Sequence, residues 1–332
     1  MPFDVVDAHV HLITTTNGVS YPWARPTPAP ACPCAPPCYC NWTLTEYGKA
    51  TAPFAPGGNS SNGGGARVGT VVFCEVGAAQ ASWLKEAEWV QRGGGQPKLP
   101  GQPNVGAVLA QTPPGFGTAP LGAVAPLLDA LAARVPLLRG VRLNGVAALA
   151  NGTLTRRFVA ALRELGRRGL VADLNLGCVT NGRALAVARA APRARFVVEH
   201  LGGCVTYAQL GNATALAAYR AALAQLAARP NVVALQLGGA ASSFRASPGG
   251  TDRLAARLAP WVGAAVDAFG YGRAVFEANW FFCNWPAPHA RLDLWSVWAR
   301  ALLGLLQGRG ATLAELRAVF RGNALKVYRA EH

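Results

Sequence analysis

Apolar and polar positions alternate along this chain in two patterns, one typical of strands and one typical of helices. Short runs rich in β-branched residues each end at a glycine or a polar residue, as buried strands do. Between them lie segments rich in Ala, Leu and Arg whose apolar residues follow a helical spacing. The runs predict strands over residues 3–11, 69–75, 104–110, 138–144, 169–175, 194–200, 232–237 and 273–279. The segments predict helices over residues 81–91, 120–134, 154–168, 182–191, 213–228, 252–269, 293–307 and 312–320.

Eight strands that alternate with helices over 332 residues indicate an α/β fold, specifically a (β/α)8 TIM barrel. A doubly wound open sheet is the alternative. It is disfavoured because no glycine-rich phosphate-binding loop follows the first predicted strand. We therefore expect a single barrel domain over residues 1–332.

The stretch from residue 25 to residue 67 has neither the strand pattern nor the helix pattern. It begins with a proline-rich half and contains the Gly/Ser/Asn tract of residues 57–65. Such a composition buries too little apolar surface to offset the entropy of ordering, so we expect a low-complexity loop inserted after the first strand. Four of the eight cysteines crowd into residues 32–40. They could hold a zinc ion, but zinc ligand pairs favour two or more intervening residues, and incidental cysteines are the preferred interpretation.

Composition limits the partners and the compartment. The 31 Lys and Arg residues outnumber the 16 Asp and Glu residues, and the net charge of +15 on its own suggests an anionic partner. Only four of these 31 are lysines, and the arginines are dispersed as in a GC-rich genome, so we expect no nucleic-acid binding. No apolar run reaches the ~18 residues of a membrane span, and no signal peptide is visible. Cysteines outside the crowded stretch stand singly, as reduced thiols do, which predicts a cytoplasmic protein; they are Cys74, Cys178, Cys204 and Cys283.

Polar residues at the carboxyl ends of the strands are the candidates for chemistry in such a barrel. The first strand ends with Asp7, His9 and His11, which a period of two places on one face. Two imidazoles at positions i and i+2 can present nitrogens to one point, as a metal ion or an oxyanion requires. The other strand ends carry Glu75, Arg142, Asn144, Asp173, Asn175, His200, Glu277 and Asn279.

These motifs resemble the amidohydrolase superfamily, specifically its amidohydrolase-related branch of fuconolactonase-like and dicarboxylate-lactonase-like TIM-barrel hydrolases. The matching segments are residues 6–12, 21–23, 71–75, 86–89, 138–142, 196–203, 231–239, 269–280, 323–324 and 327–328. They occur in the order of the family and leave only the insertion uncovered. The resemblance implies a hydrolase that acts on a small molecule at the mouth of the barrel.

The resemblance also assigns a metal site. His9, His11 and His200 would bind one divalent cation, with zinc as the expected metal. Members that resemble the dicarboxylate lactonases work without a metal, and there the same histidines would polarise the scissile carbonyl.

The remaining candidates would contact the substrate. Arg142 would bind a carboxylate of the substrate through its guanidinium group, or else form a buried ion pair with Asp173. Glu75 would position a water or a hydroxyl group. Tyr21 and Trp23 would line the mouth, or simply cover the barrel rim.

Strand eight departs from the pattern of the superfamily, whose members usually carry Asp where this chain has Asn279. An amide cannot accept a proton at neutral pH, so Glu277, one inward layer deeper, would act as the base, directly or through a water. The alternative for Glu277 is a buried partner of an arginine. A subset of the branch reads Glu-Ser-Asn here, and we keep Glu277, Asn279 and His200 as the candidate catalytic residues. A second departure is Gln236, where some relatives carry Lys.

The sequence thus predicts a hydrolase of a small, anionic lactone or another cyclic ester or amide. One alternative is a metal-dependent decarboxylase of the same superfamily, which usually needs the strand-eight Asp. The other is a catalytically silent barrel that binds a ligand or a protein, which would have no need of polar groups at its mouth. Oligomeric state has no signal in the sequence.

Overall fold

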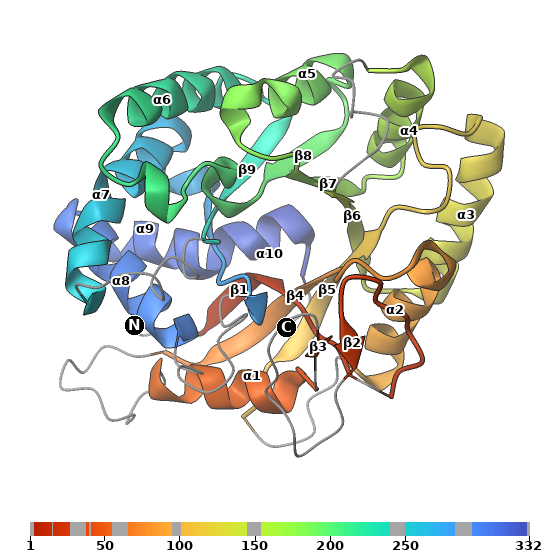
Figure 1. Ribbon diagram of the computed structural model, residues 1–332, viewed down its shortest axis with the longest axis horizontal. Helices are drawn as coiled ribbons and strands as arrows, with labels where there is room; N and C mark the ends of the chain where they lie inside the picture. Colours follow the sequence, from red (N-terminus) through yellow and green to blue (C-terminus); the bar gives the residue numbers. More distant parts are fainter. Residues whose placement is uncertain are drawn as a thin grey trace.

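Eight parallel strands form one sheet in which each strand pairs with the next strand along the chain (Figure 1). They are β1 (Val5–Val10), β4 (Val68–Cys74), β5 (Asn104–Gln111), β6 (Leu138–Asn144), β7 (Val171–Asn175), β8 (Arg195–Val198), β9 (Val232–Leu237) and β10 (Ala274–Phe276). A bridge between Val10 and Trp280 closes the sheet into a barrel. The predicted (β/α)8 TIM barrel and its eight strands are therefore confirmed. The structure is a computed structural model that describes residues 3–14, 16–26, 38–39, 41–54, 66–94, 101–144, 154–239, 250–282 and 294–330.

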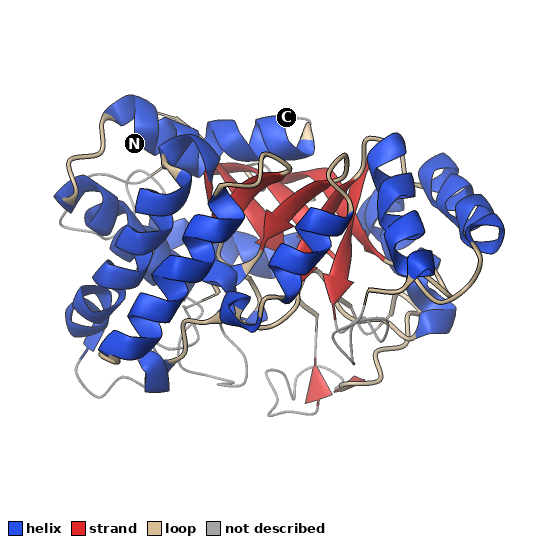
Figure 2. Ribbon diagram, turned by 90° about the horizontal axis from the view of Figure 1, so that it is seen from above, coloured by secondary structure: helices blue, strands red, loops and turns tan. Residues whose placement is uncertain are grey.

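Helices surround the sheet on its outer side (Figure 2). They are α2 (Trp83–Trp89), α3 (Leu121–Arg134), α4 (Arg156–Arg167), α5 (Arg183–Ala190), α6 (Ala213–Ala227), α7 (Gly250–Phe269), α8 (Leu294–Gly308) and α9 (Leu313–Arg317). The last helix, α10 (Asn323–Tyr328), packs instead against residues that point into the barrel. Every predicted helix is present, and the last one continues through a π-turn into α10. None of the described helices has the length and apolar character that crossing a membrane requires.

Apolar side chains form two layers because successive strand residues point to opposite sides of the sheet. Outward residues pack against the helices. Inward residues such as Val6, Val72 and Val197 fill the barrel together with Val327 and Tyr328 of α10. Arg139 and Arg195, at the starts of β6 and β8, donate to backbone carbonyls of this carboxyl-terminal segment. Helix α10 therefore plugs the barrel at the end opposite the mouth.

Part of the inserted segment 25–67 is folded, so the expectation of a loop is wrong for it. Helix α1 (Leu44–Thr51) begins with a capping box between Thr43 and Glu46, and it buries Leu44 and Tyr47. The low-complexity residues on either side conceal this short amphipathic stretch when composition is averaged over the whole segment. The backbones of β2 (Arg25–Pro26) and β3 (Cys38–Tyr39) pair with each other. The side chains of the cysteine-rich residues 32–40 lie outside the described part of the structure.

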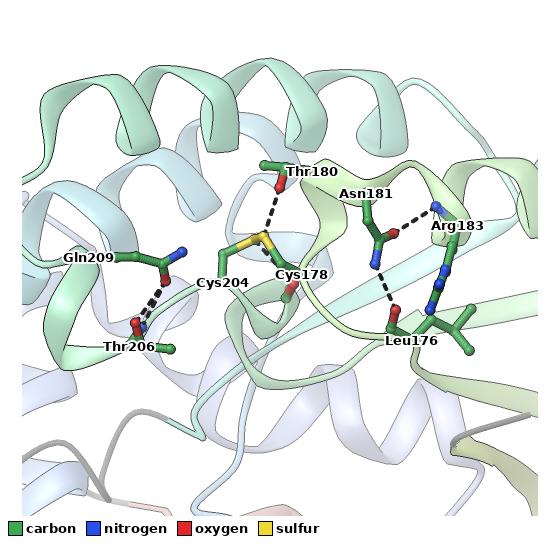
Figure 3. The surroundings of a disulfide bond; sticks show 9 residues. Leu176, Cys178, Thr180, Asn181, Arg183, Cys204, Thr206 and Gln209 are labelled. Carbon is green, nitrogen blue, oxygen red and sulfur yellow. Dashed lines mark hydrogen bonds between the residues drawn. A yellow bond between two sulfur atoms is a disulfide. The ribbon is translucent and has the colours of Figure 1, made fainter. Parts of the chain in front are cut away.

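Cys178 and Cys204, expected to be reduced, form a disulfide that joins the loops after β7 and β8 (Figure 3). The expectation is wrong because residues 26 positions apart in the chain meet where two neighbouring strands end. Cys74 is free and buried, and Cys283 lies outside the described residues. The cysteines therefore no longer support the inference of a reducing, cytoplasmic compartment.

Candidate active site

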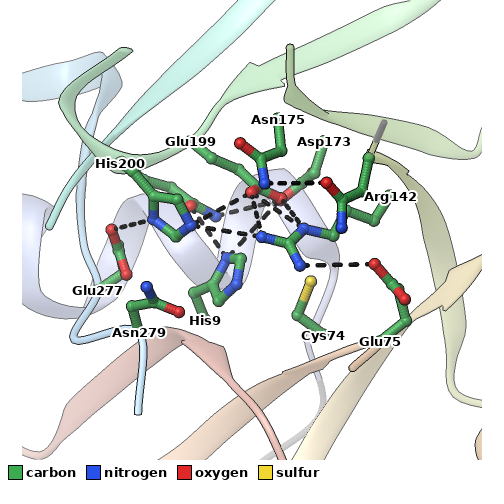
Figure 4. Close-up of polar contacts among 12 residues, drawn as sticks. His9, Cys74, Glu75, Arg142, Asp173, Asn175, Glu199, His200, Glu277 and Asn279 are labelled. Atoms are coloured by element: carbon green, nitrogen blue, oxygen red, sulfur yellow. Dashed lines mark hydrogen bonds and ion pairs between the residues drawn. The ribbon is translucent and has the colours of Figure 1, made fainter. Parts of the chain in front are cut away.

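Polar side chains from the ends of most of the strands meet at the mouth of the barrel (Figure 4). Four of these side chains point inward because the residues on either side of them in the strand pack outward against the helices. They are Arg142, Asp173, Gln236 and Glu277. All four residues are buried. The site is therefore held by the barrel itself, with little dependence on the surrounding loops.

Asp7 does not share the face of His9 and His11, contrary to the prediction. The pairing of β1 with β4 shifts between Asp7 and Val10, and this irregularity breaks the period of two. Asp7 instead faces the helices, where its carboxylate accepts from Tyr47 Oη at 2.9 Å and Trp295 Nε1 at 2.7 Å. Burial raises the pKa of Asp7 to about 7.

His9 and His11 bring their Nε2 atoms to within 3.0 Å of each other inside the barrel. Burial, reinforced by the positive charge of Arg142, holds the pKa of both imidazoles well below its usual range, so the rings are neutral. Nδ1 of His11 lies 2.9 Å from the carbonyl oxygen of Cys74, which can only accept. His11 therefore carries its proton on Nδ1 and leaves Nε2 bare.

Gln236 sets the proton of His9 in the same way. Its Nε2 donates to Asp173 Oδ2 at 3.1 Å and to Tyr328 Oη at 2.9 Å, so Oε1 is the atom that faces His9 Nδ1 at 3.2 Å. Tyr328 in turn donates to Asp173 Oδ2 at 2.7 Å. His9 therefore donates through Nδ1, and its Nε2 is also bare. Two unprotonated nitrogens face each other with no proton to share.

Asn279 reaches the same point from the end of the last strand. Its Oδ1 lies 3.1 Å from His11 Nε2. The Asn279 backbone has a φ of 54°, a left-handed conformation that asparagine tolerates better than most residues. This turn directs the amide toward the histidines just beyond the end of β10.

Arg142 is surrounded by carboxylates of the protein itself. Its Nε lies 3.0 and 3.1 Å from the two carboxylate oxygens of Glu199, and its Nη2 lies 2.8 Å from Oε2. A longer contact of 3.4 Å joins Nη1 to Glu75 Oε1. The buried ion pair weighed for Arg142 is thus present, but its partners are Glu199 and Glu75, because Asp173 is bound to Gln236 and Tyr328.

His200 and Glu277 form a second pair across the mouth, with 2.9 Å between Nδ1 and Oε1. A Cβ atom at Gly238 would lie 2.4 Å from Glu277 Cδ, and one at Gly239 would lie 2.5 Å from His200 Cβ, so the two glycines make room for the pair. Burial lowers the pKa of His200, but the charges of Glu277 and Glu199 outweigh it and the net shift is upward. Among the described residues, Glu277 Oε2 is buried without a hydrogen-bond partner. The partner of Glu277 is therefore a histidine, and the arginine partner weighed in its place is not observed.

The comparison with known proteins places this chain in a family. The family model for amidohydrolases matches residues 64–330. The chain belongs to the amidohydrolase family. An uncharacterised protein of Sinorhizobium fredii, y4mH, is 28% identical over 179 residues, which are 53% of this chain and 52% of that protein. The match thus spans about half the length of that relative.

Solved structures of two proteins share the fold of this amidohydrolase. One is an amidohydrolase from Burkholderia multivorans that is 20% identical to this chain, and the match covers 99% of this chain and 100% of that chain. Its structure with bound HEPES superposes on this one with a TM-score of 0.69, and its structure with bound zinc with a TM-score of 0.65. A probable 2-pyrone-4,6-dicarboxylic acid hydrolase from Acinetobacter baumannii with bound citric acid has a TM-score of 0.62 at 13% identity, covering 98% of this chain and 100% of that chain. At these identities the likeness shows the fold alone.

The bare nitrogens of this amidohydrolase fit a divalent cation. His9 Nε2, His11 Nε2 and Asn279 Oδ1 meet with no donor hydrogen among them, which is the arrangement of metal ligands. Within the described residues, two groups have ligand atoms within 4.8 Å of one another: His9, His11 and Cys74, and His9, Glu199 and His200. The expected set of His9, His11 and His200 is divided between these groups, with His9 common to both.

Tyr21 and Trp23 lie at the rim of the amidohydrolase barrel. Trp23 Nε1 donates to the carbonyl of Val76 at 2.7 Å, and its ring packs 5.5 Å from that of Phe282. Tyr21 is buried and hydrogen-bonds to Glu86 of α2. Burial and the neighbouring Glu75 raise the pKa of Glu86 to about 8.

Sequence reasoning did not single out Glu199, although it contacts Arg142 and lies 3.4 Å from His200 Nε2. Its signal is the period of two, because Val197 points inward and Glu199 therefore does so as well. His200 follows immediately and should point outward, but its φ of 55° turns the ring toward the mouth. Tyr328 carries no such signal, since its place in the site depends on how α10 docks.

Proposed function

We propose that this amidohydrolase hydrolyses a small, anionic lactone, or another cyclic ester or amide, at the mouth of the barrel. The observation that carries the proposal is the pair of Glu277 and His200: one carboxylate oxygen holds Nδ1 at 2.9 Å, and the other has no hydrogen-bond partner. Buried polar atoms are almost always paired, so an unpaired carboxylate oxygen at a strand end is typical of a functional base.

In the proposed reaction, Glu277 Oε2 takes a proton from a water whose oxygen bonds to the ring carbonyl carbon. In its protonated form, which the charges of Glu277 and Glu199 favour, His200 donates from Nε2 to the carbonyl oxygen as negative charge develops there. The ring C–O or C–N bond then breaks, and the leaving atom receives the proton held by Glu277. One water is consumed, and the product is an open-chain acid. Asn279 cannot take a proton and serves to orient its neighbours.

The histidines of the first strand favour the metal-dependent form of this proposal. His9 and His11 present bare nitrogens, which cannot donate to an oxyanion, so the metal-free role weighed for them lacks support. They would instead hold a divalent cation, with zinc as the expected ion. In that form His200 would be a further ligand through an unprotonated Nε2, and the ion would replace it as the group that polarises the carbonyl. When bound, such an ion polarises a carbonyl oxygen or lowers the pKa of a water.

Arg142 is the proposed contact for an acidic group of the substrate. Its Nε and Nη2 donate to Glu199, so these donors are committed within the protein. Nη1 makes only the 3.4 Å contact with Glu75, and it is the donor that a substrate carboxylate would take over. Glu75 would then be freed to position a hydroxyl group of the substrate.

A metal-dependent decarboxylase is the second candidate, because the same bare nitrogens would suit it. A panel of lactones assayed by proton release, a panel of aromatic acids assayed for carbon dioxide, and elemental analysis of the protein separate the candidates. We expect lactone turnover in the wild type and none in His9→Ala or His200→Ala, with circular dichroism checking that each variant is folded. Full activity in either variant, or carbon dioxide release alone, contradicts the hydrolase. Turnover of no substrate, even after Asn279→Asp, indicates a silent barrel.

A further inference from the structure

Cys74 is, of the cysteine side chains that the structure describes, the one outside a disulfide. It ends β4, the strand beside β1, and its side chain points into the barrel. Its sulfur and one ring nitrogen each of His9 and His11 all lie within 4.8 Å of one another. Figure 4 shows the sulfur beside the His9 ring and below the guanidinium of Arg142.

The acceptor atoms around His9 and His11 carry no negative charge. Imidazole rings bear no negative charge, and Asn279 contributes a neutral amide oxygen. A divalent cation buried among neutral groups is poorly compensated, since burial of uncompensated charge is costly. A stable cation site here therefore requires an anion in contact with it.

Among the described residues, no carboxylate forms a three-ligand group with both His9 and His11. Glu199 forms a bidentate pair with Arg142, and Glu277 is bound to His200. Asp7 faces the helices on the other side of β1. The alternative group of His9, Glu199 and His200 is crowded by Arg142, whose Nη2 lies 3.4 Å from His200 Nε2. Cys74 is the ionisable residue that forms such a group with both His9 and His11.

We propose that the thiolate of Cys74 is the third, charge-bearing ligand of a metal site completed by His9 and His11. Two imidazoles and one thiolate form a ligand set that zinc prefers, and cobalt(II) can replace zinc in such sites. Binding replaces the S–H bond with a metal–sulfur bond and releases the proton to solvent. The inference deepens the proposed function, because it names the ligands of the ion that would serve the hydrolase.

Cobalt(II) titration tests the proposal, because a thiolate ligand gives a near-ultraviolet sulfur-to-cobalt charge-transfer band that nitrogen and oxygen ligands do not. The cysteines of residues 32–40 and Cys283 could also bind cobalt, so both arms carry serine at these five positions. In this background we expect a stoichiometric charge-transfer band. Cys74→Ser should lose the band and weaken cobalt affinity by more than about tenfold. Asn279→Asp added to Cys74→Ser should restore affinity without the band.

A band that survives Cys74→Ser, or stoichiometric cobalt binding without a band in the parent, overturns the proposal. Failure of the parent to bind cobalt overturns it as well. Circular dichroism of each variant checks that the barrel is folded, and Cys74→Ala repeats the comparison if Cys74→Ser does not fold. Lactone hydrolysis is measured in parallel with and without metal. If lactone is hydrolysed but no thiolate band forms, the proposed function stands and only the role of Cys74 is refuted. If the charge-transfer band forms but no lactone is hydrolysed, the role of Cys74 stands and the proposed function is refuted.

Discussion

Glu277 Oε1 lies 2.9 Å from His200 Nδ1 and so joins the ends of two strands that are not neighbours in the sheet. β9 lies between these strands, and its following residues Gly238 and Gly239 allow the side chains to pass. The contact fixes which nitrogen of His200 faces the mouth. It also leaves the second carboxylate oxygen of Glu277 as the unpaired base.

Glu277→Gln is therefore expected to lower kcat by roughly a hundredfold to ten-thousandfold, because the amide cannot take a proton. Steady-state kinetics on a lactone that the wild type hydrolyses provides the measurement. Glu88→Gln, which removes a carboxylate on the outer helix α2, should leave kcat unchanged. Unaltered kcat in Glu277→Gln would mean that another group is the base.

Glu199→Gln should destabilise the protein strongly. It removes the carboxylate that holds Nε and Nη2 of Arg142, whose side chain is only 7% exposed. Breaking a buried pair by removing one partner costs roughly 3–5 kcal/mol of unfolding free energy. Glu75→Gln should cost less because its contact with Arg142 is longer, at 3.4 Å. Urea unfolding measures both variants, and equal losses would contradict the assignment of Glu199 as the main partner.

Glu86 should make the wild type less stable in alkaline solution. Its pKa is raised from 4.5 to about 8, so the folded state holds a proton that the unfolded state releases between these values. That stabilisation is complete below pH 4.5 and is lost as the pH rises through about 8. The loss is on the order of a few kcal/mol. Glu86→Gln should therefore raise the midpoint of thermal unfolding at pH 9 much more than at pH 5, whereas Glu88→Gln should show no such difference.

Two buried tyrosines allow a matched test of the folded part of the insertion. Tyr47 Oη donates to Asp7, whereas Tyr219 Oη is buried without a partner. Tyr47→Phe should cost about 1 kcal/mol of unfolding free energy, more if Asp7 is ionised. Tyr219→Phe should be neutral or stabilising, because it removes an unsatisfied hydroxyl group. A neutral Tyr47→Phe would show that α1 contributes little to the barrel through this bond.

Reduction of the disulfide between Cys178 and Cys204 should lower the thermal stability of the wild type. Closing a loop of 26 residues stabilises a protein by about 3 kcal/mol. Unfolding scans with and without dithiothreitol give the difference. The Cys178→Ser/Cys204→Ser variant should start from the lower midpoint and show a smaller response to the reductant. An equal response in both proteins would assign the effect to other thiols.

The barrel could be predicted from the sequence because β-branched runs and helical spacing are local signals that the fold preserves. The same is true of His9, His11, Arg142, Glu277 and Asn279, which the structure brings to one mouth. The period of two gave the wrong side-chain direction where the backbone of a strand is irregular. Asp7 points outward because the strand pairing shifts, and His200 points inward because its φ is 55°. Such deviations depend on tertiary packing and have no local signature.

Contacts between residues that are far apart in the chain could not be predicted from the sequence either. The sequence identifies charged residues but not their partners, so Asp173 was the partner considered for Arg142 in the alternative of a buried ion pair, whereas Glu199 is the partner observed. Single cysteines looked reduced until two loops brought Cys178 and Cys204 together. Helix α1 was concealed because composition averages over a segment, whereas a capping box needs only Thr43 and Glu46.

Tyr328 has a consequence for the order in which this site can form during synthesis. His9 lies in the first strand, but Gln236 and Tyr328, which set its proton, lie in β9 and α10. A nascent chain in which α10 is still inside the ribosome lacks the bond from Gln236 to Tyr328 and keeps only the one to Asp173. The orientation of the Gln236 amide, and with it the position of the proton on His9, is therefore fully set only after α10 has left the ribosome and docked against the barrel.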